Sequence, residues 1–320
     1  MEKIYDIVVW GASGFTGRLA VDYIYKNQKN SNVTWAVAGR NKSKITEVLD
    51  GKDIPILIAD SHDKESLVNL VKQTKVILTT VGPYARYGSE LVEACAENGT
   101  HYCDLTGEVH WMRHMISKYQ TIAKESGAKI VHTCGFDSIP SDIGVYFLQK
   151  NMRELHGVNA KKIKYRTRGF SGGASGGTVD SLMSMMEQAK KDSSILKIIA
   201  NPYALNDKHK GLDGPDKMSP YFDDDFDAWV GPFIMAGINT RVVRRTNELL
   251  DNIYGEDFEY NEGSITGKGP KGLIGATTSG MVTGGMAGMA AFSPTRSILK
   301  SFLPKPGRSE ERRVGKECER

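Results

Sequence analysis

Short apolar runs alternate along the first half of the chain with segments whose apolar residues recur at helical spacing. The first apolar run, of strand-forming residues, covers Ile7 to Trp10, and helical spacing follows from Arg18 to Tyr25. Further short runs cover 33–38, 54–58, 76–80, 101–104 and 129–133, with helices between them. Parallel neighbouring strands need crossover connections, so six strands alternating with helices predict an α/β fold with a doubly wound parallel sheet.

The alternation of short apolar runs with helical segments ends near residue 161. Charged and apolar residues alternate over 162–168, a Gly/Ser-rich turn covers 169–178, and a methionine-rich helix is expected over 179–190. We therefore predict a first domain over 1–152 and a second, α+β domain over 153–307 that takes the substrate. Residues 308–320 alternate charges without apolar periodicity, which predicts a disordered or foreign tail.

The turn between the first strand and the first helix carries the strongest functional signal. It reads Gly11, Ala12, Ser13, Gly14, Phe15, Thr16 and Gly17. Glycine lets backbone N–H groups approach a pyrophosphate, and a helix N-terminus adds a partial positive charge. The turn therefore predicts a dinucleotide site, and the alternative is a glycine-rich turn without a ligand.

The end of the second strand indicates which dinucleotide. An NAD-binding chain places Asp or Glu there for the ribose 2′-hydroxyl, whereas this chain has Arg40, whose guanidinium suits a 2′-phosphate. We therefore predict NADP, with Arg40 as the main discriminator and Asn41, Ser43 or Lys44 as a helper; the alternative is a solvated arginine. At the ends of later strands, Asp60 is expected near the adenine, and Gly82 and Pro83 over the nicotinamide ribose.

Composition narrows the classes of function. The net charge of the 320 residues is only +4 and basic residues are interspersed with acids, so no nucleic-acid partner is expected. The four cysteines have no C-x-x-C spacing, which suits reduced thiols. The first strand begins almost at the N-terminus, so we expect no leader peptide and a cytoplasmic location.

One long segment, 272–295, contains no charged residue. Its length would span a bilayer, and Gly280, Gly284 and Gly288 repeat the small-residue spacing of packed membrane helices. Its many glycines make it weakly hydrophobic. Contact with a membrane and burial against the sheet both stay open as expectations.

Taken together, the ordered motifs resemble the saccharopine dehydrogenase-like oxidoreductases, and more closely the branch that includes the bacterial trans-acting enoyl reductases. The residues that carry this resemblance are 11–17, 38–40, 81–84, 101–108, 135–142, 175–178, 231–245 and 302–307. The resemblance implies an NADP-type Rossmann domain and, for the bacterial members, reduction of an enoyl double bond during lipid and glycolipid synthesis.

The resemblance also implies two alternatives to enoyl reduction. Eukaryotic relatives associate with lipid droplets and membranes, so a catalytically inactive nucleotide-binding protein on such a surface is one alternative. A saccharopine dehydrogenase-type amino-acid oxidoreductase is another, although the apolar second half favours a greasier substrate. A lipid or acyl substrate, peripheral membrane or lipid-droplet association and a homodimer are the expected partners.

Three side chains at strand ends are candidates for catalysis. Tyr84 is the first candidate hydrogen-bond donor to the substrate, and Asp104 and Asp137 could relay a proton or could instead cap helices. For the substrate, Arg241, Arg244 and Arg245 could hold a carboxylate or phosphate, or could form a solvated helix face.

Two further patterns are weaker. Tyr146 and Lys150 have the Tyr-x-x-x-Lys spacing of short-chain dehydrogenases, but chance gives about one such match in a chain of this composition. His110 and His114 have a zinc-compatible spacing without a third ligand, so we expect no metal.

Overall fold

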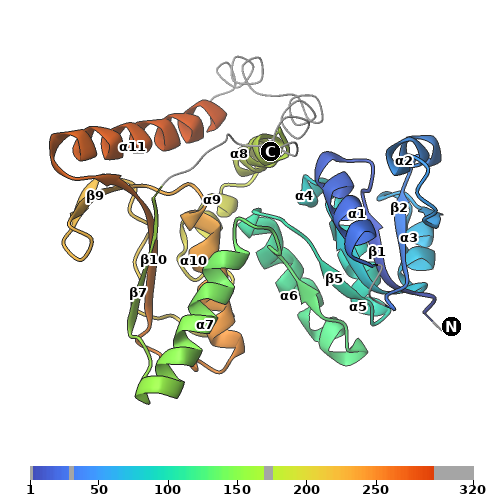
Figure 1. Cartoon of the computed structure of the whole chain (residues 1–320), viewed down its shortest axis with the longest axis horizontal. Coiled ribbons are helices and arrows are strands. Elements are labelled where there is room, and N and C mark those ends of the chain that lie inside the picture. Colours follow the sequence, from blue (N-terminus) through green and yellow to red (C-terminus); the bar gives the residue numbers. More distant parts are fainter. Residues whose placement is uncertain (1–2, 29–31, 169–175, 292–320) are drawn as a thin grey trace. The chain divides into compact units, whose positions relative to one another are not determined.

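The computed structural model describes residues 3–28, 32–168 and 176–291. Within them the chain divides into two compact units, the first comprising 3–135 and 176–184, the second 136–168 and 185–291 (Figure 1). The expected boundary at residue 152 lies inside helix α7 (Ile139–His156), which belongs wholly to the second unit. The expected tail over 308–320 and the end of the uncharged segment, 292–295, lie outside the described residues.

The first unit is built on a six-stranded parallel sheet in the order β3-β2-β1-β4-β5-β6. Its strands are β1 (Tyr5–Trp10), β2 (Trp35–Gly39), β3 (Ile56–Ile58), β4 (Thr74–Thr79), β5 (His101–Cys103) and β6 (Ile130–Val131). Strand β1 pairs with both β2 and β4, so strand order reverses beside β1. This is the doubly wound Rossmann arrangement that the sequence predicts, and its reversal point marks where ligands bind.

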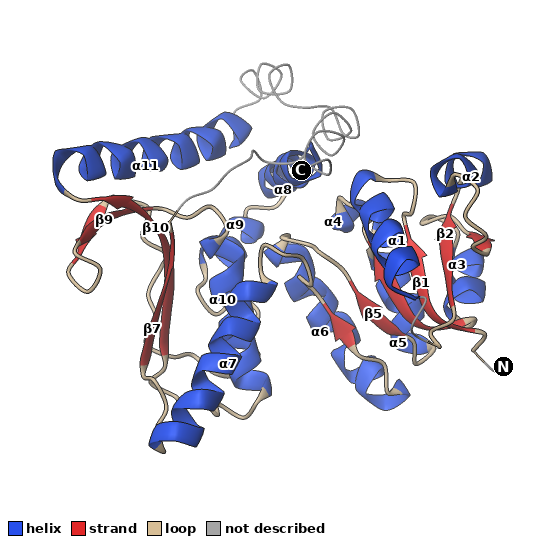
Figure 2. Ribbon diagram, viewed as in Figure 1, coloured by secondary structure: helices blue, strands red, loops and turns tan. Residues whose placement is uncertain are grey.

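Helices connect these strands, as Figure 2 shows. They are α1 (Phe15–Asn27), α2 (Lys42–Leu49), α3 (Lys64–Val71), α4 (Tyr84–Tyr87), α5 (Ser89–Glu97) and α6 (Val109–Ser126). The apolar runs of β1 and β2 face the helices: Val9 and Val37 are fully buried with Val21 of α1 and Ile45 of α2. Burying these side chains fixes the strand-to-helix turns at one edge of the sheet.

The second unit has a mixed four-stranded sheet in the order β7-β10-β9-β8, which confirms the expected α+β character. Its strands are β7 (Lys162–Thr167), β8 (Tyr221–Asp223), β9 (Ala228–Gly231) and β10 (Glu259–Gly267). Its helices after α7 are α9 (Ser194–Ala200), α10 (Ala236–Leu249) and α11 (Gly269–Ala291), while α8 (Gly176–Lys191) belongs partly to each unit. Val145 of α7 and Val243 of α10 pack with three aromatic residues as its core, Tyr254, Phe258 and Tyr260.

The acidic run at 223–225 contains one buried carboxylate, that of Asp223. Asp223 ends β8 and is only 3% exposed. Its carboxylate accepts hydrogen bonds from Lys164 Nζ at 2.7 Å and from Arg166 Nη2 at 2.8 Å. Two cations on β7 therefore neutralise a buried carboxylate, which sequence spacing alone does not reveal.

Helix α11 contains the described part of the uncharged segment. It packs against β9 and β10 of its own unit, with Ala276 fully buried. Among the described residues, no helix is both long enough and apolar enough to cross a membrane.

Candidate cofactor and active site

The glycine turn joins β1 to α1 by close backbone contacts. Gly11 adopts a φ of +91°, which favours glycine, and its carbonyl oxygen accepts a hydrogen bond from the Gly14 N–H at 2.9 Å. A Cβ atom on Gly17 would lie 2.8 Å from the Gly11 carbonyl carbon and closer still to its oxygen. The first turn of α1 thus packs directly on the backbone of the turn, and only glycine permits this.

The N-terminus of α1 meets the requirements of an anion site. Gly14 is the N-cap and supplies no side-chain hydrogen bond, and the first turn contains no acidic residue. A capping side chain would normally accept hydrogen bonds from the first backbone N–H groups of a helix, and an acidic residue in the first turn would offset the positive end of the helix dipole. Since α1 has neither, its first N–H groups and its positive end can interact with a bound anion. The residues present therefore fit the pyrophosphate of a dinucleotide.

The second strand places Arg40 at the same edge of the sheet. Gly11 N–H donates to the Ala38 carbonyl oxygen at 3.0 Å, which ties the glycine turn to the end of β2. Arg40 follows this strand and is exposed, and within the described residues its guanidinium makes no ion pair. Asn41 instead caps α2, its side-chain oxygen accepting from Lys44 N–H at 3.0 Å. Arg40 is thus free to meet an anion, while Asn41 has a local structural task.

Asp60 follows β3 and shapes the turn before α3. Its Oδ1 accepts a hydrogen bond from the His62 N–H at 3.0 Å, and its own N–H donates to Ser66 Oγ at 3.0 Å. Asp60 is half-buried. Its contact with an adenine stays a prediction.

The turn after β4 lies against the glycine turn. A Cβ atom on Gly11 would meet Val81 Cγ2 at 2.5 Å. In the same turn Gly82 is exposed and Pro83 is buried. Val81 therefore lies beside the glycine turn, and the expected place of Gly82 near the cofactor stays a prediction.

Tyr84 points into the unit. It is 3% exposed, and its hydroxyl donates to the Thr79 carbonyl oxygen at 3.3 Å and accepts from the Leu105 N–H at 3.4 Å. Burial raises the pKa of this hydroxyl well above its ordinary value, and the nearby Asp104 adds to the shift. A hydroxyl bonded on both sides to backbone braces two strand ends. The role of Tyr84 as a donor to a substrate stays a prediction.

Glu108 lies beside the turn after β4 and was not predicted from the sequence as a site residue. It is 2% exposed, and its two carboxylate oxygens accept the N–H groups of Tyr84 at 2.8 Å and Ala85 at 2.9 Å. Ser181 Oγ donates to it as well, at 3.0 Å. Burial raises the pKa of Glu108, and the bonds from the two backbone N–H groups oppose that shift. Glu108 thus fixes the turn after β4.

Asp104 lies at the end of β5 and bonds to His132 at the end of β6. Asp104 Oδ2 is 2.7 Å from His132 Nδ1 and 2.9 Å from the Tyr102 hydroxyl, and the Asp104 side chain is fully buried. Sequence reasoning found Asp104 but missed His132, although its position at the end of a predicted strand was a usable signal. Asp104 caps no helix, so the expected capping role is wrong for this residue.

Asp137 belongs to the second unit. It is exposed and precedes α7, where Ser138 is the N-cap and makes no side-chain capping bond. The Asp137 carbonyl oxygen accepts from Asn239 Nδ2 at 2.9 Å. A catalytic role for the Asp137 carboxylate stays a prediction.

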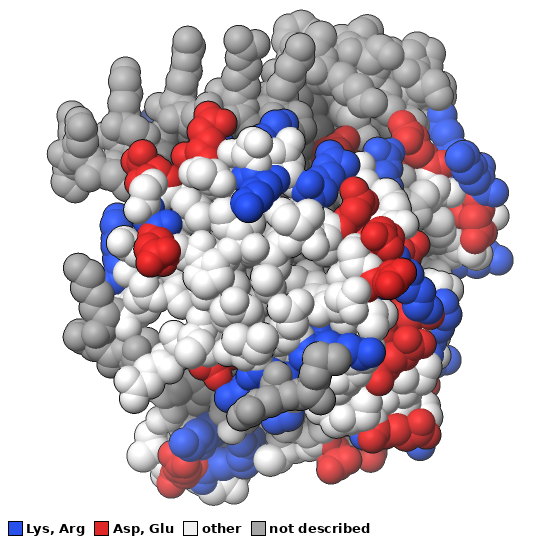
Figure 3. All heavy atoms as spheres, turned by 90° about the vertical axis from the view of Figure 1, so that its right-hand side faces the viewer, with Lys and Arg blue, Asp and Glu red and all other residues white. Residues whose placement is uncertain are grey.

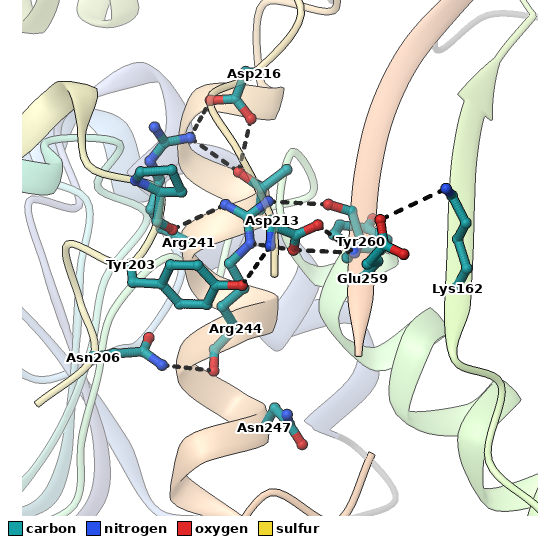
Figure 4. Close-up of polar contacts among 12 residues, drawn as sticks. Lys162, Tyr203, Asn206, Asp213, Asp216, Arg241, Arg244, Asn247, Glu259 and Tyr260 are labelled. Carbon is teal, nitrogen blue, oxygen red and sulfur yellow. Dashed lines mark hydrogen bonds and ion pairs between the residues drawn. The ribbon is translucent and has the colours of Figure 1, made fainter. Parts of the chain in front are cut away.

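Arg241 and Arg244 of α10 are held inside the second unit (Figure 4). Arg244 is 4% exposed; it bonds Asp213 Oδ2 at 2.7 Å and the carbonyl oxygens of Pro202 and Tyr260 at 2.9 and 3.0 Å.

The other two arginines of α10 are likewise paired. Arg241 is 3% exposed and pairs with Asp216, and Arg245 pairs with Asp207 at 3.0 Å. All three anchor the 201–216 segment to α10. They form neither a solvated face nor an open anion site, so we assign them no substrate.

The Tyr-x-x-x-Lys spacing and the histidine pair of α6 gain no support as functional sites. Tyr146 is 41% exposed on α7, and Lys150 pairs with Glu154 at 3.7 Å. His110 is buried in α6. Among the described residues, no group of three potential ligands could hold a metal ion.

Comparison with known proteins identifies the family. Residues 7–131 match the model of the saccharopine dehydrogenase NADP binding domain. The chain is 37% identical over 324 residues to a Mycobacterium tuberculosis protein provisionally named a trans-acting enoyl reductase, which covers 95% of this chain and 76% of the relative. It is 34% identical to the trans-acting enoyl reductase of Mycobacterium ulcerans, over 96% of this chain and 77% of the relative.

A solved structure gives a weaker match. The apo saccharopine dehydrogenase of Saccharomyces cerevisiae aligns with a TM-score of 0.37 and 15% identity, over 51% of this chain and 34% of its own. The family model and the sequence relatives carry the assignment: the first unit is an NADP-binding domain, and the chain belongs to the saccharopine dehydrogenase-like oxidoreductase family, in the branch of the trans-acting enoyl reductases.

Proposed function

We propose that the protein is an NADP-dependent oxidoreductase that reduces the enoyl double bond of a lipid-linked or acyl substrate, such as a lipid or glycolipid precursor. The observation that carries the proposal is the uncapped N-terminus of α1 behind the close-packed glycine turn, in a domain that matches an NADP-binding family. Relatives named trans-acting enoyl reductase support the reaction type.

The chain's own residues would hold the cofactor as follows. The backbone N–H groups from Ser13 to Thr16 would bind the pyrophosphate at the positive end of α1. Arg40 would bind the 2′-phosphate, and Gly82 would border the nicotinamide end. When bound, NADPH supplies the hydride, and the protein has to orient the substrate, exclude water and provide a proton.

Arg40 gives the first test. Substituting Arg40→Ala should weaken NADPH binding about 10- to 100-fold, because a charge-assisted guanidinium–phosphate contact is worth about 1.5–3 kcal/mol. NADH, which lacks the 2′-phosphate, should bind almost unchanged. Lys72→Ala is a matched control, because it removes one exposed positive charge from the same unit. Fluorescence titration measures both cofactors, and equal losses for NADPH and NADH would contradict the role of Arg40.

Turnover gives the second test. NADPH oxidation should follow addition of α,β-unsaturated acyl thioesters or lipid-linked enoyl compounds, and saccharopine should not be a substrate. Turnover of saccharopine alone would favour the amino-acid alternative. Tight NADPH binding without turnover across a broad enoyl panel would favour an inactive nucleotide-binding protein.

Peripheral contact with a membrane or a lipid droplet is a separate part of the proposal. Its support is α11, where Ile274, Met281 and Val282 are 66%, 64% and 56% exposed. Exposed apolar side chains on one helix favour contact with a lipid surface. Flotation with vesicles or artificial droplets should be reduced when these three residues are replaced by Ser. The homodimer stays a prediction for light scattering to test.

Charge distribution agrees with a small-molecule substrate. The face shown in Figure 3 carries basic and acidic residues interspersed around a largely uncharged middle. A continuous basic stripe would favour nucleic acid. The expected lack of a nucleic-acid partner stays a prediction.

A further inference from the structure

The ends of β5 and β6 carry a buried carboxylate–imidazole pair. Asp104 Oδ2 lies 2.7 Å from His132 Nδ1. The Asp104 side chain has an exposed fraction of 0%, whereas that of His132 is 6%. The imidazole is therefore the part of this pair that solvent can reach.

Three other donors surround the Asp104 carboxylate. The N–H groups of Thr106 and Thr133 each donate to Oδ1 at 3.0 Å, and the Tyr102 hydroxyl donates to Oδ2 at 2.9 Å. An ionised carboxylate only accepts hydrogen bonds, so the contact with His132 requires a proton on Nδ1. This arrangement orients the ring and leaves Nε2, which has no hydrogen-bond partner among the described residues, as the atom that can exchange a proton.

The backbone beside His132 is held in an unusual conformation. Thr133 has a φ of +60°, which is rare for a β-branched residue. Its N–H is the donor to Asp104 Oδ1, so the same carboxylate that orients the ring also holds this turn. The indole ring of Trp111 packs edge-on against the imidazole at a centroid distance of 5.1 Å and limits its rotation. Strained residues of this kind are concentrated at functional sites.

The pair lies at the edge of the sheet that carries the glycine turn. The strands are parallel, so the carboxyl ends of β1, β4, β5 and β6 lie on one edge. Near Asp104 on this edge, the Tyr84 hydroxyl accepts a hydrogen bond from Leu105 N–H. A proton donor at this edge is placed on the side of the domain where ligands bind.

We propose that His132 is the catalytic residue that gives the substrate its proton and that Asp104 is its positioning residue. This inference rests on the proposed enoyl reduction. When bound, the nicotinamide cofactor would supply the hydride that adds to the β-carbon, and the π electrons of the double bond would pass to the carbonyl oxygen as an enolate. A new C–H bond forms at the α-carbon with the proton of the His132 Nε2–H bond, and the imidazolium becomes a neutral ring protonated on Nδ1. Solvent then returns one proton to Nε2.

Several titratable groups surround the pair and enter any pH dependence. Tyr102 bonds directly to Asp104 from β5, and the Trp111 ring that packs on His132 from α6 does not titrate. The other titratable groups that interact with Asp104 are Cys103, Tyr84 and Glu108.

The first experiment measures turnover and cofactor binding together. His132→Gln keeps a hydrogen-bonding amide but cannot deliver a proton, so kcat should fall about 100- to 10,000-fold while the Kd for NADPH changes less than threefold. The kcat–pH profile should lose the limb that requires a protonated group. Tyr102→Phe is the matched control, since it removes one neutral donor to Asp104 and leaves the pair intact; its kcat should fall less than tenfold.

A second measurement does not depend on turnover. Nitrogen-15 NMR of the cofactor-free protein should show that the neutral His132 ring carries its proton on Nδ1, and Asp104→Asn should abolish that preference. Protonation on Nε2 alone in the unsubstituted protein would overturn the inference. Asp104→Asn should also lower kcat at least tenfold with little change in NADPH affinity.

The outcomes separate this inference from the proposed function. Enoyl turnover by the unsubstituted protein that His132→Gln leaves unchanged would overturn only the role of His132. NADPH binding without turnover of any enoyl substrate would overturn the proposed reaction and this inference with it. If His132→Gln lowers the melting temperature and loses NADPH affinity, the decisive results are the NMR tautomer and the kinetics of Asp104→Asn.

Discussion

Gly17→Ala tests whether backbone packing at the glycine turn creates the cofactor site. A Cβ atom at residue 17 would lie 2.8 Å from the Gly11 carbonyl carbon and 3.0 Å from Ala12 Cα. These are backbone atoms, which cannot move aside as the end of a flexible side chain can. Carbon atoms in van der Waals contact are about 3.5–4.0 Å apart, so the turn and the helix must separate by about 0.7 Å or more.

This displacement has two measurable consequences. Overpacking of this kind costs about 1–3 kcal/mol of stability. It also moves the first N–H groups of α1 relative to the turn, and each charge-assisted hydrogen bond lost to the pyrophosphate costs about 1.5–3 kcal/mol. Since about 1.4 kcal/mol corresponds to a factor of ten, NADPH affinity should fall at least tenfold. NADH affinity should fall by a similar factor, because both cofactors share the pyrophosphate.

The assay is fluorescence titration with both cofactors, paired with thermal unfolding. Gly107→Ala is the matched control, because Gly107 lies in an exposed turn of the same unit and a Cβ there would meet no atom within 4 Å. We expect Gly107→Ala to leave cofactor affinity unchanged. An unchanged affinity in Gly17→Ala would refute the reasoning, since the clash would then have relaxed without disturbing the anion site.

Four further changes test individual contacts. Glu108→Gln should lower the free energy of unfolding by about 1–3 kcal/mol, because an NH₂ group replaces one acceptor of a backbone N–H; thermal melts measure this. Burial raises the pKa of Asp142 to about 6, so its contribution to the free energy of unfolding is present below about pH 4 and is lost as pH rises through 6. Urea melts at several pH values measure the free energy of unfolding against pH, and Asp142→Asn should flatten this dependence between about pH 4 and 6. Arg244→Lys should cost about 1–3 kcal/mol in urea unfolding, because an ammonium cannot reproduce three directed contacts. Gly144→Ala should raise the free energy of unfolding by about 0.5–1 kcal/mol in the same assay, since Gly144 lies inside α7 with open space around it.

The first unit could be predicted largely from the sequence because its signals are local. Short apolar runs between helical segments fix six strands, and parallel strands impose crossover helices. Some bounds were less predictable: the run at 129–133 yields only Ile130–Val131 as strand. The range of helix α2 was not predicted, although Asn41 is a usable N-cap signal.

The second unit was harder to predict because its polar side chains pair over long sequence distances. Arg244 bonds Asp213, 31 residues earlier, and Arg166 bonds Asp223, 57 residues later. Local spacing gives the face of a helix on which an arginine lies but not the acid that meets it. The expectation that the arginines of α10 bind a substrate therefore rested on their charge alone, and arginines that form buried ion pairs carry the same charge.

Three carboxyl groups of the first unit show why residue type at a strand end does not decide its role. Asp60 accepts a local backbone N–H and shapes a turn, and Glu108 accepts two N–H groups and fixes another turn. Asp104 also accepts two backbone N–H groups, but its second oxygen is shared by the Tyr102 hydroxyl and the imidazole of His132. Of these three carboxylates, only that of Asp104 is bonded to an imidazole, which can donate a proton from its other nitrogen. The hydrogen-bond partners therefore distinguish the two carboxylates that fix turns from the one that orients a proton donor, and the proposed proton donor is His132 at the end of β6.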